Sequence, residues 1–359
     1  MQCSSDCSGA GMRAGGIDLG KDIVVARSGD INRTCQYVLA NTRVDGAADT
    51  RPCLFGDMLS RMPDLVKEQL VDLQSVAQEC AGDYQTADKH NISRDLCIDV
   101  RAILRNCMSQ LRLDTIANCL AHKTDCPVFQ QRVDGKVRVD VIGTCCQPFS
   151  IVNQKRAGLL DERCLVFFQW VLERYVSLED IFILECTVGF WAEGLQLLFA
   201  GLYDVKFVYL SPTDNDVPAE RNRLYAVGIK CDSWRWGIGF TKLNILALSG
   251  FSGEKSHQRG SIYYRMDDSD EVQAEYRKLA QLRGMTSDRD LVYADVCCPS
   301  STAHIAEFEQ HVENHRAAIA ADHGLTFDSQ HWRQYSSSSL YCPALLRKSI
   351  MCNSSSAEH

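Results

Sequence analysis

Three features that would assign a protein to a broad class are missing from this sequence of 359 residues. There is no excess of positive charge, because 38 lysines and arginines stand against 46 aspartates and glutamates, for a net charge of −8. Binding of nucleic acid by bulk charge is therefore excluded, whereas a local basic cleft is not. There is no apolar leader, and the most apolar stretch, 181–203, is interrupted by Glu185 and Glu193. We expect no secretory signal and no membrane partner.

Cysteine is abundant, but the spacings that give it a familiar role are missing. No two of the 18 cysteines form a C-x-x-C pair, and two pairs, Cys145–Cys146 and Cys297–Cys298, are adjacent. Adjacent cysteines suit neither zinc ligation nor ordinary disulfides, so we expect no metal site. Reduced thiols in an intracellular protein fit this pattern, the nucleus being one candidate compartment. A thiol oxidoreductase is disfavoured because the redox motif is absent.

Short apolar runs alternate with helical patterns over the first two thirds of the chain. Helices are predicted at 31–42 and 164–176. Strands are predicted at 22–27, 53–55, 137–143, 181–186, 204–210 and 223–229. This alternation is typical of βαβ units around a parallel sheet, hence of an α/β fold. Between 59 and 120 the apolar residues recur at i, i+3 and i+4, which predicts an inserted block of helices.

Two polar turns at predicted strand ends are candidates for binding a cofactor. The turn DCSGAGM carries Gly9 and Gly11, and glycine lets a backbone approach a bound nucleoside closely. Asp57 follows the strand at 53–55, where a carboxylate accepts hydrogen bonds from an adenine amino group or a ribose. An ordinary glycine-rich turn and an ordinary turn aspartate are the alternatives.

Two further strand ends carry residues suited to covalent chemistry on an electron-poor ring. Cys146 follows the strand at 137–143, and Glu185 lies at the end of the strand at 181–186. Ends of adjacent parallel strands share one rim, so a thiolate nucleophile and an acid there reach one substrate. The alternatives are a buried structural cysteine, with Cys145 competing for the catalytic role, and a solvated glutamate.

Arg221 and Arg223 alternate just before the last predicted strand. Alternate residues of an extended chain point to the same side, so the pair is suited to gripping a phosphate or a base edge. An exposed face of surface arginines is the alternative.

The order of these features resembles that of the DNA (cytosine-5) methyltransferases. The resemblance covers about residues 6–230. Its most specific part runs from 143 to 229, where GTCCQPFS, RAGLLDER, ILEC and VPAERNRLYAVGI occur at spacings like those of the family. It implies a Rossmann-like sheet of the type found in S-adenosylmethionine-dependent methyltransferases, with DNA as the partner.

The resemblance implies a cofactor site for S-adenosylmethionine. Gly9 and Gly11 match the first cofactor loop, and Asp57 matches the aspartate that receives the adenine amino group. The glutamate that usually holds the cofactor ribose is replaced by Ser28, and Asp30, two residues on, is the candidate substitute.

The resemblance also implies catalytic roles. Cys146 matches the nucleophile that attacks carbon 6 of a flipped-out cytosine, and Glu185 matches the acid that contacts nitrogen 3. Arg221 and Arg223 match the paired arginines that hold the base and a neighbouring phosphate. The implied reaction is transfer of a methyl group to carbon 5 of cytosine.

The sequence departs from the family pattern in several places. Cys145 replaces a proline, Cys186 and Thr187 replace an asparagine and a valine, and Ala219 replaces a glutamine. Of the family's last motifs only a trace remains, in LYCPALLRKSI. Two alternatives therefore stay open: a methyltransferase-like protein that binds nucleic acid or a partner without turnover, and a tRNA cytosine-5 methyltransferase.

These patterns predict three regions. Residues 1–230 form the catalytic domain, with a helical insertion at about 59–125. Residues 231–340, where the alternation of strands and helices ends, form the target recognition region, and 341–359 hold the incomplete last motif and a tail. The sequence does not give the oligomeric state.

Overall fold

The computed structural model describes a defined set of residues, which fall into two compact units. The described residues are 2–6, 24–41, 52–82, 86–129, 131–150, 153, 157–215, 219–248, 270–282, 284–285, 325–328, 337–338, 342–343 and 351–354. The first unit comprises Met1–Tyr209 and Arg223–Asn244, and the second comprises Leu210–Asn222 and Ile245–His359. The loop with Gly9 and Gly11 lies outside the described residues.

The first unit is built on a seven-stranded sheet with the order β3-β2-β1-β6-β7-β10-β8. The strands are β1 (Gln2–Asp6), β2 (Val24–Gly29), β3 (Cys53–Phe55), β6 (Arg138–Gly143), β7 (Ile181–Thr187), β8 (Tyr203–Leu210) and β10 (Arg223–Lys230). Strands β3, β2, β1, β6 and β7 run parallel, and β10 pairs with β7 antiparallel. The strand order reverses between β1 and β6, as in a doubly wound sheet. The α/β Rossmann-like fold expected from the sequence is confirmed.

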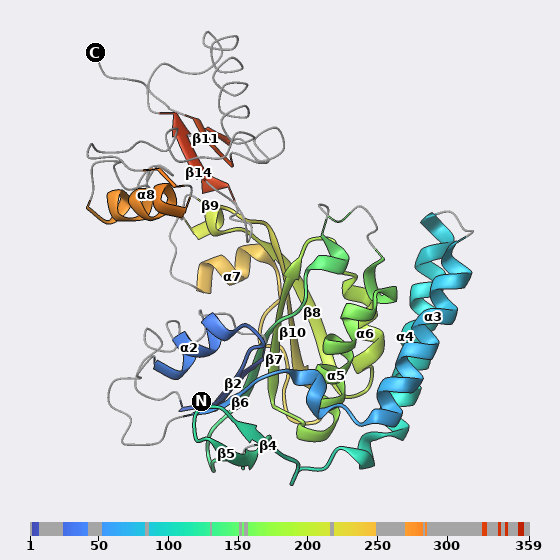
Figure 1. Cartoon of the computed structure of the whole chain (residues 1–359). Helices are drawn as coiled ribbons and strands as arrows, with labels where there is room; N and C mark the ends of the chain where they lie inside the picture. Colours follow the sequence, from blue (N-terminus) through green and yellow to red (C-terminus); the bar gives the residue numbers. More distant parts are fainter. Residues whose placement is uncertain are drawn as a thin grey trace. The chain divides into compact units, whose positions relative to one another are not determined.

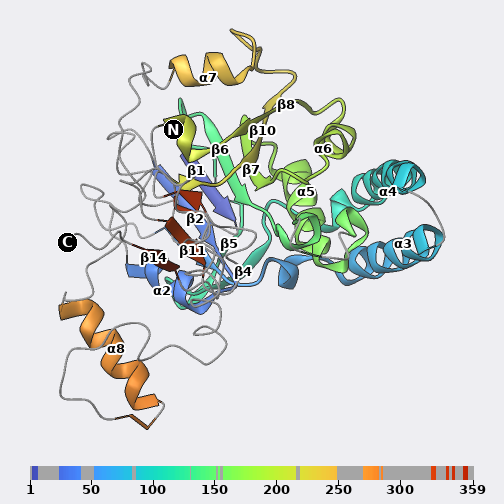
Figure 2. The same cartoon turned by 90° about the horizontal axis from the view of Figure 1, so that it is seen from above.

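Helices in two layers cover one face of this sheet (Figures 1 and 2). Helices α5 (Leu165–Ser177) and α6 (Ala192–Phe199) lie next to the strands, and α3 (Asp64–Gly82) and α4 (Thr86–Asn106) pack outside them. Helix α5 has aromatic and aliphatic side chains all round, because it is enclosed by the sheet on one side and by helices on the other. A shorter helix, α2 (Arg33–Asn41), follows β2 and contacts β3.

The insertion between β3 and β6 is only partly helical, which corrects the prediction of helix over about 59–125. A 3-10 turn, η1 (Met58–Arg61), precedes α3, and α4 ends at Asn106. The chain then forms a hairpin of β4 (Ile116–Cys119) and β5 (Thr124–Pro127). Its apolar residues suggested helical spacing, but backbone bonds to the edge strand β3 favour extended structure, as when the Leu120 N–H donates to the Leu54 carbonyl at 2.7 Å.

The sheet is joined to α5 by a buried group of ion pairs. Its members are Asp6, Arg27, Arg61, Asp140, Glu173, Arg174 and Glu179. Arg27 Nη2 lies 2.5 Å from Asp6 Oδ2 and 3.0 Å from Glu173 Oε2. All these side chains are buried. Burial of charge is tolerated only when partners are in place, so this group fixes α5 against β1, β2 and β6.

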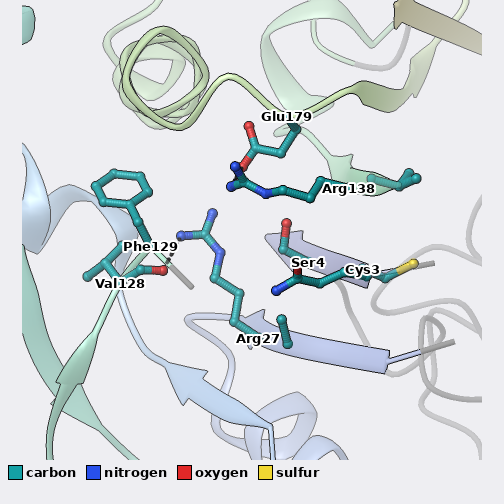
Figure 3. A pocket seen from close by; sticks show the side chains of 10 residues that line it. Cys3, Ser4, Arg27, Val128, Phe129, Arg138 and Glu179 are labelled. Carbon is teal, nitrogen blue, oxygen red and sulfur yellow. Dashed lines mark hydrogen bonds and ion pairs between the residues drawn. The ribbon is translucent and has the colours of Figure 1, made fainter. Parts of the chain in front are cut away.

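A small cavity beside Arg27 belongs to this buried region (Figure 3). The Arg27 side chain points toward Val128, and its Nη1 donates to the Val128 carbonyl at 3.1 Å. Arg138 lies beside Glu179, with Nη2 3.5 Å from Oε1. The cavity holds about 20 Å³, which is room for a single water molecule rather than a ligand.

The buried carboxyl of Glu173 makes the free energy of unfolding depend on pH in the acid range. Burial alone would raise its pKa, but Arg61, Arg27 and Arg174 together outweigh burial and hold the pKa at about 2, below the usual 4.5. A group whose pKa is depressed in the folded state stabilises the fold above its unfolded pKa and loses that contribution as the pH falls toward the folded value. We therefore expect the urea midpoint of unfolding to fall most steeply between pH 4.5 and about 2.

Two neighbouring carboxyls modify this dependence. The pKa of Asp140 is also lowered, because Arg174 and Arg27 outweigh its burial. Asp6 acts in the opposite sense, since burial raises its pKa, and its contribution is lost as the pH rises. A urea midpoint that stayed the same from about pH 7 to about pH 3 would contradict a stabilising ionised Glu173.

The second unit has short elements within its described residues. They are η6 (Pro212–Asn215), β9 (Ala219–Glu220), α8 (Asp270–Leu282), β11 (Leu325–Asp328), β12 (Ser337–Ser338), β13 (Cys342–Pro343) and β14 (Met351–Ser354). Strand β11 pairs with β12 and β14, and β13 pairs with β9. Helix α7 (Lys242–Leu248) follows the first unit's last strand. Within the described part of the chain, no helix is both long and apolar enough to cross a membrane.

Candidate active site at the carboxyl edge of the sheet

The parallel strands place their last residues along one edge of the sheet. Ser28 of β2 is in register with Ser5 of β1 and Leu54 of β3. Gly143, which ends β6, is in register with Glu185 of β7. Ligands of open α/β sheets bind at this edge, next to the point where the strand order reverses.

A cavity of about 490 Å³ lies at this edge. Its lining comes from the ends of β1, β2, β3 and β6 and from the start of α5. The lining residues are Asp6, Gly29, Asp30, Ile31, Gly56, Asp57, Met58, Leu59, Gly143, Cys145, Gln147, Arg163 and Val166. The volume is in the range of sites for small molecules and cofactors, and the lining combines apolar side chains with a few carboxylates.

Two of the predicted cofactor residues, Asp30 and Asp57, lie in this lining. Asp57 caps η1, where its Oδ1 accepts a hydrogen bond from the Leu59 N–H at 2.9 Å. A carboxylate has about four acceptor positions, so the cap leaves capacity for a ligand. Asp30 Oδ1 accepts from the Asn32 N–H at 2.8 Å. Ser28 is buried and does not line the cavity, whereas Asp30 does.

Gly29, which lies between Ser28 and Asp30, allows the ends of β1 and β2 to approach each other closely at the cavity. A Cβ atom added to Gly29 would lie 2.8 Å from Asp6 Oδ1, closer than real Cβ contacts come. Asp6 has no freedom to withdraw, since it is held by its ion pair with Arg27. The end of β2 therefore approaches the end of β1 more closely than a residue with a side chain would allow.

The two adjacent cysteines in the loop after β6 differ in their exposure to solvent. Cys145 is half-buried and lines the cavity, whereas Cys146 is exposed and begins the 3-10 turn η3 (Gln147–Phe149). Burial raises the pKa of the Cys145 thiol, which keeps it protonated and a weak nucleophile. Of the adjacent cysteines, Cys146 is thus the one open to a large substrate.

Glu185 lies on the same rim as this loop. The Thr144 N–H, two residues before Cys146, donates to the Glu185 carbonyl at 3.2 Å. The Glu185 side chain is 30% exposed, and its Oε1 lies 2.7 Å from Arg223 Nε. The structure thus pairs Glu185 of β7 with Arg223 of β10, and it bonds the end of β7 to the backbone of the loop that carries Cys146.

Arg221 is not joined to this group. It is exposed and belongs to the second unit, where its backbone N–H donates to Ser211 Oγ at 3.4 Å. Arg223, by contrast, is the first residue of β10 and belongs to the first unit. The expectation that the pair alternates along one extended segment applies only in part, because β10 begins at Arg223.

Arg163 is a cation at the site that residue-by-residue reasoning missed. It lines the cavity, and its Nη1 donates to Gln147 Oε1 at 3.0 Å. Its other contacts are with Asp161, which accepts from Nε at 2.7 Å and from Nη2 at 2.5 Å. These bonds raise the pKa of Arg163 and keep it charged. The signal was in the sequence, as the last residue of RAGLLDER.

Burial argues against two other cysteines near this edge as nucleophiles. Cys186 follows Glu185 in β7, and burial raises its pKa to about 12. Cys164, at the start of α5, is buried as well, and burial raises its pKa well above the ordinary value. A thiol in such surroundings stays protonated at neutral pH and behaves as a small apolar side chain.

Comparison with known proteins gives structural similarity only. No family model and no curated protein matches the sequence. Among solved structures, the Dnmt2 methyltransferase of S. pombe matches with a TM-score of 0.42 and 13% identity, over 79% of this chain and 65% of that one. A putative DNA modification methyltransferase from an E. coli prophage matches with a TM-score of 0.34 and 14% identity, over 65% of this chain and 47% of that one. The Entamoeba histolytica methyltransferase EhMeth matches with a TM-score of 0.36 and 11% identity, over 76% of this chain and 62% of that one. The chain spans less than two thirds of each of these proteins.

Proposed function

We propose that the chain is an S-adenosylmethionine-dependent methyltransferase that acts on carbon 5 of cytosine in DNA, with Cys146 as its nucleophile. The observation that carries this proposal is one of placement. A cavity with carboxylates at the ends of β1, β2 and β3 adjoins the loop that carries Cys146, and this loop is bonded to the strand end that carries Glu185.

The side chains of the cavity fit the chemistry of S-adenosylmethionine. Asp57 would accept from the adenine amino group and Asp30 from the ribose hydroxyls, since carboxylate oxygens are hydrogen-bond acceptors. Met58 and Val166 supply apolar contact for the adenine ring. The negative charge of these aspartates also favours a cationic sulfonium. The bound cofactor supplies an electrophilic methyl group.

The rim residues account for activation of the cytosine. The Cys146 thiolate adds through Sγ to carbon 6 of a base flipped out of its stack, which raises the electron density at carbon 5. Glu185 donates a proton to nitrogen 3 as the ring gains negative charge, and its contact with Arg223 fixes the position of the carboxyl. Carbon 5 would then take the methyl group as the bond between that methyl and the sulfonium sulfur breaks. Water takes the carbon 5 proton, and the electron pair of that C–H bond re-forms the carbon 5–carbon 6 double bond as Sγ leaves as a thiolate.

Cofactor binding is the first test of this proposal. Removal of the Asp57 carboxylate by Asp57→Ala deletes a charge-assisted hydrogen bond, whose contribution is about 1.5–3 kcal/mol. We expect the affinity for S-adenosylmethionine, measured by titration calorimetry, to fall by about 10-fold to 100-fold. Asp57→Asn keeps the cap on Leu59 and should have an intermediate affinity.

The matched control is Asp64→Ala, since Asp64 is an aspartate at the start of α3 that does not line the cavity. Its affinity should equal that of the unaltered chain. If the folded chain binds no S-adenosylmethionine, the proposed function is wrong and the protein is a methyltransferase-like binding protein. If it binds the cofactor and methylates tRNA but not duplex DNA, the substrate part of the proposal is wrong.

A further inference from the structure

Four metal-ligating side chains from three segments meet at the outer edge of the sheet. Cys53 is the first residue of β3, and Cys119 is the last residue of β4. His122 lies in the turn of the β4–β5 hairpin, and Cys126 lies in β5. One ligand atom from each lies within 4.8 Å of all the others. No C-x-x-C pair marks this cluster in the sequence, so the expectation of no metal site missed it.

The distances within this cluster match those of a tetrahedral metal centre. His122 Nδ1 lies 3.3 Å from Cys119 Sγ, 3.4 Å from Cys126 Sγ and 3.7 Å from Cys53 Sγ. In a tetrahedral zinc site with Zn–S bonds of about 2.3 Å and a Zn–N bond of about 2.0–2.1 Å, each sulfur lies about 3.5 Å from the nitrogen. The three observed distances bracket this value.

Hydrogen bonding and disulfide formation do not account for the arrangement. An imidazole nitrogen offers either one lone pair or one N–H, so a single Nδ1 satisfies one thiol and not three. A disulfide would join two of the cysteines and leave the third and the histidine without a role. A shared cation bonded to all four atoms explains the convergence on one point.

A backbone donor fixes the position of the Cys119 sulfur within the cluster. The Leu54 N–H donates to Cys119 Sγ at 3.4 Å. A donor of this kind orients a metal ligand, as outer-shell groups do in known metal sites.

We propose that Cys53, Cys119, His122 and Cys126 bind one structural zinc ion, which fastens the β4–β5 hairpin to the edge strand β3. Three thiolates and an imidazole are a soft donor set, which selects zinc over calcium or magnesium. Four protein ligands complete a tetrahedral shell and leave no position for a substrate, so the role is structural.

The proposed zinc ion would help to protect the edge strand of the sheet. Strand β3 has only three residues and lies at the end of the sheet order, where an unpaired edge invites association with other chains. The hairpin covers this edge through the bond from the Leu120 N–H to the Leu54 carbonyl and through the metal. Cys53 and His122 are 69 positions apart, so the metal also closes the long loop that contains α3 and α4.

The test is the metal content of the full chain, purified without chelators and measured by mass spectrometry. We expect one zinc per chain in the unaltered protein and in Cys80→Ser, whose cysteine is exposed on α3 away from the cluster. His122→Ala and Cys126→Ser should lose at least half of the zinc. Full zinc in these two variants, or less than a tenth of an equivalent in the unaltered chain, overturns the proposal.

A second measurement needs no variant in the cluster. Chelation of the unaltered chain should lower the midpoint of thermal unfolding by several degrees, and added zinc should restore it. Cobalt added to the chelated chain should give the intense visible bands of a tetrahedral site and the ultraviolet band of thiolate ligation. An unchanged unfolding midpoint together with the spectrum of octahedral, aqueous cobalt contradicts the site.

Discussion

Cys146→Ser is expected to lower methyl transfer by about three orders of magnitude or more. A serine hydroxyl in place of the thiolate cannot add efficiently to carbon 6, and losing a nucleophile typically removes most of the catalytic advantage. The readout is incorporation of labelled methyl groups into duplex DNA and, in parallel, into tRNA. Binding of S-adenosylmethionine should persist, because Cys146 does not line the cavity.

Cys145→Ser is the matched control for this change. Cys145 lines the cavity and is half-buried, so its replacement should alter cofactor affinity modestly and leave turnover within about tenfold of the original. The exposed cysteine Cys80 offers a second control on a distant helix. If Cys145→Ser abolished transfer while Cys146→Ser retained it, the two roles would have to be exchanged.

Arg174→Met should be the most damaging substitution for stability. Arg174 is fully buried in α5 and pairs with Asp140 and, at 3.3 Å, with Glu179. A methionine fills much of the space but removes the nearest cation from two buried carboxylates, leaving Asp140 with Arg27 at 3.9 Å and Glu179 with Arg138 at 3.5 Å. Breaking a buried ion pair in this way costs about 3–5 kcal/mol. A domain is stable by only about 5–15 kcal/mol, so the urea midpoint should fall by about a fifth or more.

A surface arginine provides the matched control for stability. Arg112 pairs with Asp114 at 3.1 Å, but both side chains are more than two thirds exposed, so Arg112→Met should barely move the midpoint. The double variant Arg174→Met with Asp140→Leu should recover part of the loss, since it removes a buried carboxylate that has lost its nearest cation. Equal midpoints for Arg174→Met and Arg112→Met would contradict a stabilising role for the buried ion pairs.

The fold could be predicted from the sequence where apolar runs were long and bounded by polar turns. The runs that became β6, β7, β8 and β10 were predicted to within two residues. The hairpin of β4 and β5 was missed because its apolar residues also fit a helical spacing, and its stabilising contacts come from β3, far away in the chain. The buried charges could not be predicted either, since each depends on partners from other strands and helices.

The candidate site was predictable to the extent that it lies at strand ends. Parallel strands place their ends on one edge, and this rule brought Asp57, Cys146 and Glu185 to the same edge. The rule about strand ends could not predict that Cys145 is half-buried and Cys146 exposed, because their burial depends on how the turn after β6 folds. The metal cluster was not predicted, for another reason. Three of its members lie close together in the sequence between Cys119 and Cys126, but the fourth, Cys53, lies on a strand far away in the chain.

The most direct measurement of the central claim is covalent trapping on nucleic acid that contains 5-fluorocytosine, in the presence of S-adenosylmethionine. Fluorine at carbon 5 blocks the loss of a proton, so the Sγ–carbon 6 bond cannot be released. Peptide mapping by mass spectrometry should find the nucleotide on Cys146, and no adduct should form when the cofactor is omitted or when Cys146→Ser is used. An adduct on Cys145, or none with either DNA or tRNA from a folded chain that binds the cofactor, would contradict the proposed catalytic site.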